Sequence, residues 1–167
     1  KRLWDHLVEA GSAHGMEYGS MTSMGMRRIE AGILDNISDF DISMTPFQAG
    51  LGRFIELDKE GFIGREALLE ADQRSLLLGL KCKVVTPEEG DETLEGSVAV
   101  GHVTAACWSP TLDCGIGYAR FYESQDWVGR TLALATSGGE NAPCEIVELP
   151  FYDAEKRIPR GIEISDS

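Results

Sequence analysis

The sequence predicts an α+β chain with a helix-containing front and an all-β back, which folds as a small antiparallel barrel or sandwich. Apolar residues repeat at helical spacing in two segments before residue 35. After residue 75, strand-like runs alternate with acidic, Gly-rich or Pro-rich turns, and no helical pattern separates them. With 167 residues, 43% of them apolar, the chain has the length of one domain or two small ones.

Two helices are predicted at the start of the chain. The first is amphipathic, about ten residues long, and is ended by Gly11 and Gly15. The second is expected to begin at a hydroxyl N-cap within residues 20–23 and to run to about Leu34. Its buried stripe is expected to comprise Met24, Met26, Ile29 and Ile33.

Three further patterns complete the front and its junction with the back. The segment RFIELD, residues 53–58, alternates apolar and charged residues and predicts a short strand. The segment GREALLEADQR, residues 64–74, predicts a short helix after Gly64. The segment EEGDETLE, residues 88–95, carries five acidic residues and predicts a solvated loop.

Five apolar runs in the back are predicted as strands. They cover residues 75–85, 97–108, 114–121, 130–136 and 144–151. Glycines within them, Gly79, Gly101 and Gly117, suit the sharp bends that barrel closure needs. The change of period places the boundary between front and back near residues 72–75.

Composition excludes several classes of function. A net charge of −13 disfavours binding to nucleic acid, which is itself an anion. No apolar run approaches the roughly 20 residues that a membrane span needs. The four cysteines show no C-x-x-C spacing, so we expect no metal site and buried thiols in a reducing compartment, which predicts a cytoplasmic protein.

Local catalytic motifs are missing from the sequence. It contains no G-x-S-x-G, no Walker loop and no H-E-x-x-H. His102 alternates with small apolar residues and is predicted to be a half-buried histidine on a strand.

A family resemblance rests on longer motifs. The segments RRIEAGI, TPFQAGLGRFIELDKEGFIGREALL, VGHVTAACWSPTLDCGIGYARF and ELPFYD occur in this order. Together they resemble the folate-dependent aminomethyltransferase family: the glycine cleavage T-protein, the dimethylglycine and sarcosine dehydrogenases, and folate-dependent demethylases. The related iron–sulfur maintenance proteins carry a cysteine in the KEGFIGRE loop, where this chain has Gly61, so that branch is disfavoured.

The resemblance implies that the chain is the C-terminal half of a three-part enzyme, an interpretation that fits its start at Lys1 directly before a helix. Residues 1–73 would end a ferredoxin-like α/β folate-binding domain. Residues 74–167 would form the family's C-terminal Greek-key β-barrel. The family transfers a one-carbon group to tetrahydrofolate, using an aspartate that lies in the N-terminal half. We therefore expect no catalytic residue here and an inactive chain in isolation.

The family's folate contacts map onto this chain with departures. Met24 replaces a folate-contacting arginine, Arg53 replaces a tryptophan, and Leu77 stands where an arginine is frequent. Met24, Arg28, Glu30 and Arg53 are the predicted cofactor-binding residues. Glu30 is expected to pair with a neighbouring arginine rather than to act as a base. The departures favour a divergent branch, such as a demethylase with another methyl donor.

The implied partners are a small-molecule one-carbon donor and the missing N-terminal half. A lipoyl carrier protein is implied only if the activity is glycine cleavage. Nucleic acid and membrane are not expected partners. The alternative to an enzyme is a folate-binding or scaffold protein of the same family without turnover.

Overall fold

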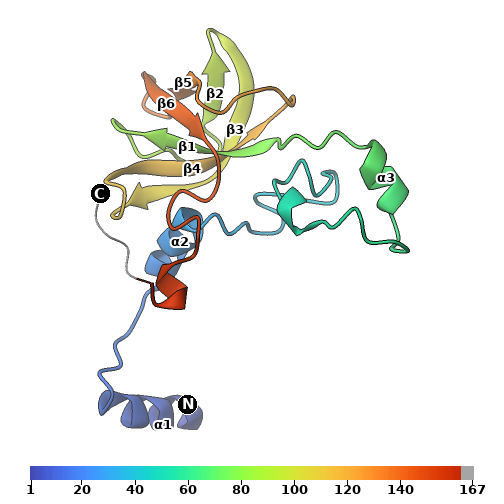
Figure 1. The fold of residues 1–167 in the computed structure, drawn as a ribbon. Coiled ribbons are helices and arrows are strands. Elements are labelled where there is room, and N and C mark those ends of the chain that lie inside the picture. Colours follow the sequence, from blue (N-terminus) through green and yellow to red (C-terminus); the bar gives the residue numbers. More distant parts are fainter. Residues whose placement is uncertain (163–167) are drawn as a thin grey trace.

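Six strands form a closed antiparallel barrel in the computed structural model, which describes residues 1–162 (Figure 1). The strands are β1 (Leu77–Cys82), β2 (Glu92–Glu95), β3 (Val98–Ser109), β4 (Cys114–Phe121), β5 (Thr131–Ala135) and β6 (Asn141–Val147). The helices are α1 (Arg2–Ser12), α2 (Met21–Glu30) and α3 (Arg65–Glu70), and the 3-10 turns are η1 (Gly52–Phe54) and η2 (Ile158–Arg160).

The barrel has the strand order β1-β4-β3-β2-β5-β6. Strands β2, β3 and β4 follow one another as neighbours, and β1 lies beside β4 although a long link joins it to β2. This is a Greek-key arrangement. The sheet closes where β1 pairs with β6, so it has no free edge. The structure thus confirms the predicted barrel and decides between barrel and sandwich.

Alternating side chains fill the barrel interior. In β6, Ala142, Cys144 and Ile146 are buried while the residues between them are more exposed. The Phe121 and Trp127 rings stack with their centroids 4.6 Å apart. The interior cluster comprises Leu80, Cys82, Val103, Ala119, Phe121, Trp127, Leu132, Leu134, Cys144 and Ile146.

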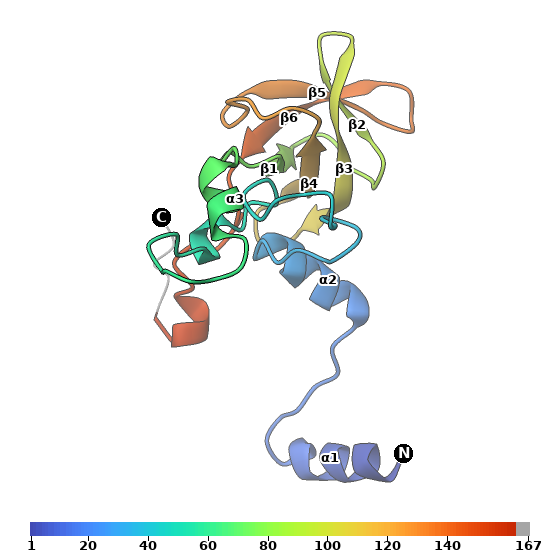
Figure 2. The ribbon, with the colours of Figure 1, turned by 90° about the vertical axis from the view of Figure 1, so that its right-hand side faces the viewer.

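Helix α2 covers the outer face of β3 and β4, and both ribbon views show it against the barrel (Figures 1 and 2). Ile29 from the helix packs in a second cluster with Leu77, Ile116 and Tyr118 from the strands. The chain after β6 returns to the same place, where the Phe151 ring lies parallel to that of Tyr118 at 6.2 Å. The end of α2 therefore packs against the strands of the barrel and against the chain that follows β6.

Helix α1 extends away from the barrel (Figures 1 and 2). It follows the predicted amphipathic pattern, yet Leu3, Trp4 and Leu7 are all more than half exposed. The contact of Trp4 is local, a stack on Tyr18 at 5.8 Å. Among the described helices, none combines the length and the apolar composition that crossing a bilayer requires.

Helix α2 is shorter than predicted. Its N-cap is Ser20, within the expected range, but it ends at Glu30 because Gly32 adopts the left-handed conformation with φ of 65°. The predicted buried stripe is correct for Ile29 and wrong for Met24 and Ile33, which are 64% and 58% exposed.

Two predictions of local structure are wrong. Residues 53–58 do not form a strand, because η1 begins the segment with a 3-10 turn. The acidic segment 88–95 is not simply a solvated loop, because its second half is β2, which pairs with both β3 and β5. Thr93 points inward and is fully buried, while Glu92 and Glu95 stay exposed. The helix predicted after Gly64 is confirmed as α3.

Two glycines inside strands lie where neighbouring segments pack closely. A Cβ on Gly79 would lie 2.7 Å from the Phe151 ring, and one on Gly101 would lie 2.7 Å from the carbonyl oxygen of Arg120. Gly101 also sits at the bulge between β2 and β3. At these two positions, the missing side chain lets neighbouring segments approach.

Candidate functional site

The junction between α2 and the barrel brings together two of the four predicted site residues, Arg28 and Glu30. Helix α2 starts with a capping box, in which Ser20 and Ser23 exchange hydrogen bonds of 3.0 and 3.3 Å. Arg28 and Glu30 lie in the last turn of the helix, which packs on β3 and β4. The sequence spacing that predicts a helix here therefore also places their side chains against the barrel.

Arg28 is held by Asp39, a fully buried residue of the loop after α2. The Nη1 atom of Arg28 donates to the Asp39 carboxylate at 2.7 Å and to the Ile33 carbonyl at 3.1 Å. Asp39 also accepts hydrogen bonds of 2.7 Å from the backbone N–H of Asp35 and from the hydroxyl of Thr104 on β3. The carboxylate thus ties the helix end and its following loop to the barrel wall.

Glu30 turns its carboxylate into the interface, where it is 3% exposed. It accepts a hydrogen bond of 2.6 Å from the Ser109 hydroxyl and a longer one of 3.4 Å from the backbone N–H of Thr111. The predicted pairing of Glu30 with a neighbouring arginine is wrong, because the last residue of β3 and the turn after it supply its partners. The Glu30 carbonyl accepts from the N–H groups of Phe151 and Tyr152, both at 3.1 Å.

Tyr118 on β4 connects the barrel to the end of α2 and to the loop that follows it. Its hydroxyl lies 3.1 to 3.2 Å from the carbonyl oxygens of Arg28 and Ile29 in the last turn of α2 and of Ile33 in the loop that follows. The Arg28 guanidinium lies 5.7 Å above the Tyr118 ring. Burial raises the pKa of Tyr118, so the phenol stays protonated and acts as a donor.

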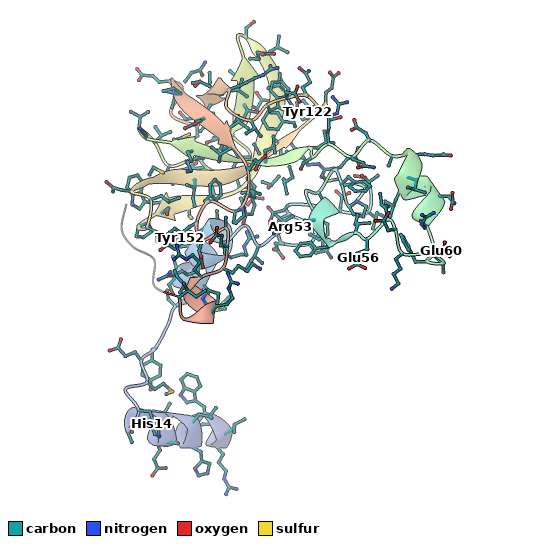
Figure 3. The ribbon with its side chains drawn as sticks, in the orientation of Figure 1. His14, Arg53, Glu56, Glu60, Tyr122 and Tyr152 are labelled. Atoms are coloured by element: carbon teal, nitrogen blue, oxygen red, sulfur yellow. The ribbon has the colours of Figure 1, made fainter. Side chains whose placement is uncertain are left out.

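The other two predicted site residues lie outside this network. Met24 is 64% exposed on the first part of α2. Arg53 is exposed on η1, with its guanidinium 4.9 Å above the ring of Phe54, itself 66% exposed (Figure 3). Leu77, where the family frequently has arginine, is buried beneath α2 and offers no polar group.

A second polar group lies on the outer wall beside the junction. Arg120 of β4 donates to the Asp41 carboxylate at 3.2 Å and to the Ser43 hydroxyl at 3.1 Å. Hydrogen bonds from Ser43 and then from Arg120 lower the pKa of Asp41 to about 2. His102 is the cross-strand neighbour of Arg120 and is half-buried on β3, as predicted. Burial, and to a lesser extent the positive charge of Arg120, lowers the pKa of His102.

Two open hollows lie on the front part of the chain, away from these networks. One of about 590 Å³ is lined by Glu60, Gly61, Phe62, Gly64, Arg65, Glu66 and Ala67. A second of about 400 Å³ is lined by Pro46, Phe54, Ile55, Glu56, Lys59, Phe62 and Leu68. None of the four predicted cofactor-binding residues lines either hollow.

Sequence reasoning missed the partners that organise the site. Asp39, Thr104, Ser109, Tyr118 and Arg120 come from a loop and two strands far along the chain. Thr104 and Ser109 belong to the VT and SPT parts of the longer motifs, so their place in those motifs was the available signal. Their pairing with α2 depends on the tertiary fold.

Comparison with known proteins agrees with this architecture. Residues 74–153 match the family model described as the glycine cleavage T-protein C-terminal barrel domain, and residues 1–59 match the GCVT N-terminal domain. The aminomethyltransferase T of the glycine cleavage system from Bartonella henselae shares the fold, with a TM-score of 0.71 and 22% identity over 82% of this chain and 40% of that chain.

Curated relatives show the same relationship in sequence. The chain is 34% identical to an aminomethyltransferase of Streptomyces avermitilis, over 93% of this chain and 44% of that protein. It is 33% identical to a trimethylamine-oxide aldolase of Ruegeria pomeroyi, over 95% of this chain and 21% of that protein. The chain thus spans less than half the length of these relatives. With both family models matched and the barrel present, the chain belongs to the glycine cleavage T-protein family.

Proposed function

We propose that this chain forms the C-terminal half of a tetrahydrofolate-dependent aminomethyltransferase or methyltransferase of one-carbon metabolism. The single observation that carries this proposal is the match to aminomethyltransferases over more than nine-tenths of this chain and 44% of theirs. In this proposal residues 1–73 complete the folate-binding domain and residues 74–167 are the barrel domain. The N-terminal half supplies the catalytic carboxylate.

The role of this chain is then to position one wall of the folate site. Asp39 and Glu30 fasten the end of α2 to β3 and to the turn that follows it. Because these contacts are buried, the helix has a defined orientation on the barrel. A rigid support of this kind lets exposed side chains on the front part face the other half of the protein in a fixed arrangement.

The predicted contacts fit tetrahydrofolate only in part. Folate offers an aromatic ring system and carboxylates, which call for apolar or aromatic surface and for cationic donors. Met24 and the Arg53–Phe54 pair are exposed and have this chemistry. Arg28 and Glu30 are already engaged with Asp39 and Ser109, so we assign them to positioning the helix and not to holding the cofactor.

The one-carbon donor defines two versions of this proposal. If the activity is glycine cleavage, the donor arrives on a lipoyl carrier protein. The similarity to a trimethylamine-oxide aldolase, at 33% identity, supports a second version in which the donor is a small N-methyl compound. Met24 and Arg53, which depart from the usual family residues, are consistent with the second version.

Calorimetric titration with tetrahydrofolate tests the proposal. The full-length protein that contains this chain should bind the cofactor, while the chain alone should bind it weakly or not at all. In the full-length protein, Arg53→Ala should weaken binding by about 10- to 100-fold, the loss expected for a charged hydrogen bond. Arg74→Ala is the matched control, because Arg74 is an exposed arginine engaged with Asp72.

The outcomes separate the candidate functions. Binding together with turnover of glycine or of an N-methyl compound supports the enzyme and identifies its donor. Binding without turnover of any donor tested would favour the folate-binding scaffold. Failure of the full-length protein to bind tetrahydrofolate would overturn the proposal.

A further inference from the structure

The seam that closes the barrel places two cysteines opposite each other. Strands β1 and β6 pair in the register Gly79↔Val147, Leu80↔Ile146 and Lys81↔Glu145. Extended by one residue on each strand, the same register places Cys82, the last residue of β1, opposite Cys144 on β6. Both are buried in the interior cluster, at 0% and 1% exposed.

The two thiols share that cluster. The Cys144 sulfur lies 3.6 Å from the Leu132 carbonyl oxygen, to which its S–H donates. Opposed residues of an antiparallel pair have Cα atoms roughly 4.5–5.5 Å apart. That separation lies within the range of about 4.4–6.8 Å that disulfides span. The backbone therefore needs little movement to accommodate a bond between them.

The pair is also unequal in reactivity. The neighbouring Cys82 thiol lowers the pKa of the Cys144 thiol. The Cys144 thiol, together with burial, raises the pKa of Cys82. Between two thiols of nearly equal exposure, the one with the lower pKa is the better first target of an oxidant, while its neighbour remains available to react with the oxidised sulfur.

We propose that Cys82 and Cys144 form an oxidisable dithiol site, in which a hydroperoxide converts the pair to a disulfide that joins β1 to β6. The Cys144 sulfur first attacks the peroxide oxygen, which breaks the O–O bond, gives a sulfenic acid and releases water or an alcohol. The Cys82 sulfur then attacks the Cys144 sulfur, the S–S bond forms, and the hydroxyl leaves as water. Two electrons pass from the thiols to the peroxide, and their two protons end in the released products.

The other two cysteines lack this arrangement. Cys107 on β3 is paired with Ile116, and Cys114 on β4 is paired with Ser109. They share a face of the sheet but are not opposite each other, and diagonal neighbours lie roughly 7–8 Å apart. Burial raises the pKa of both thiols. They therefore serve as internal controls for thiol oxidation elsewhere in the same chain.

Peptide mapping after mild hydrogen peroxide treatment tests the proposal on the unmodified chain. After remaining thiols are alkylated under denaturing conditions, trypsin releases Cys82 in the dipeptide 82–83 and Cys144 in the peptide 131–156. We expect these two peptides to be recovered joined, with the loss of two hydrogens, and to separate on reduction. Cys107 and Cys114 should be recovered alkylated.

A double variant, Cys107→Ala with Cys114→Ala, keeps the proposed pair and removes its competitors. It should form the same crosslink at the same rate as the unmodified chain. The oxidised form should melt higher than the reduced form by roughly 5–10 °C, because the bond closes a long loop of the unfolded chain. Recovery of Cys82 and Cys144 as alkylated or sulfinic forms without a crosslink, or a linkage between Cys107 and Cys114 instead, would overturn the proposal.

Discussion

The hydroxyl of Ser109 donates a 2.6 Å hydrogen bond to the carboxylate of Glu30, which lies 79 residues earlier in the chain. Both side chains are buried. The contact links the last turn of α2 to the last residue of β3, and the N–H of Thr111 in the following turn adds a second donor to the same carboxylate. Because a carboxylate removed from water needs such donors, the position of α2 on the barrel depends on this pair.

Replacement of Glu30 is the first test of that dependence. Glu30→Ala should lower the free energy of unfolding by about 1.5–3 kcal/mol, since it removes hydrogen bonds to a charged acceptor and leaves the Ser109 hydroxyl buried. Urea unfolding followed by tryptophan fluorescence measures the change. Glu66→Ala, at a carboxylate whose side chain is 88% exposed, is the matched control and should change stability by less than about 0.5 kcal/mol. Equal effects of the two variants would contradict the assignment.

Asp39 should be more sensitive than Glu30. Asp39→Ala would leave Arg28 and Thr104 without their buried partner, which predicts a loss of about 3–5 kcal/mol in unfolding free energy. Asp72→Ala breaks the exposed Asp72–Arg74 ion pair, which at 2.8 Å is nearly as short as the 2.7 Å pair of Arg28 and Asp39, and should cost about 0–1 kcal/mol. Thermal unfolding of both variants in one buffer gives the comparison. A loss at Asp39 no larger than that at Asp72 would show that burial does not decide the strength of the pair.

Much of the barrel follows from the sequence, because its strands alternate inward and outward residues between clear turns. Strand β4 matches its predicted run of residues 114–121, and β1 and β5 lie within theirs. Strand β3 ends one residue beyond its predicted run, at Ser109, and β6 begins three residues before its run and ends four residues short of it. Strand β2 escaped prediction because four residues, two of them glutamates, carry no apolar alternation of their own. Its pairing with β3 and β5 decides its structure, which is a tertiary effect that local preference does not contain.

The site was predictable to a lesser degree. The motif resemblance directs attention to Arg28 and Glu30, and both prove central to the α2–barrel junction. Their partners Asp39 and Ser109 could not be assigned. The chain between these two residues forms loops, η1, α3 and three strands whose register is unknown beforehand. Contact of Met24 and Arg53 with folate stays a prediction, while Arg28 and Glu30 are assigned to positioning α2.

Asp41 gives the chain a defined response to acid. Its folded pKa of about 2 lies below the usual 3.8 because Ser43 and Arg120 hydrogen-bond the ionised form. A depressed carboxyl pKa contributes stability that is present above the unfolded value and is lost as the pH falls toward the folded value. Stability should therefore fall between about pH 4 and pH 2, and Asp41→Asn should reduce the slope in that window. NMR titration of Asp41 checks the value directly, and Arg120→Gln should raise its pKa. An unchanged slope in Asp41→Asn would assign the acid response to other carboxylates.

Two glycines should respond in opposite directions to the same added methyl group. A Cβ on Gly79 would meet the Phe151 ring at 2.7 Å and the Val147 side chain at 3.0 Å, so Gly79→Ala should displace the segment that packs against Tyr118. The expected cost is about 1–3 kcal/mol. Gly25 lies within α2 with nothing within 4 Å of the added atom, so Gly25→Ala should stabilise the chain by about 0.5–1 kcal/mol through helix propensity. Urea unfolding of both variants measures the two signs. If Gly79→Ala is neutral, the return of the chain to α2 does not contribute to the stability of the junction.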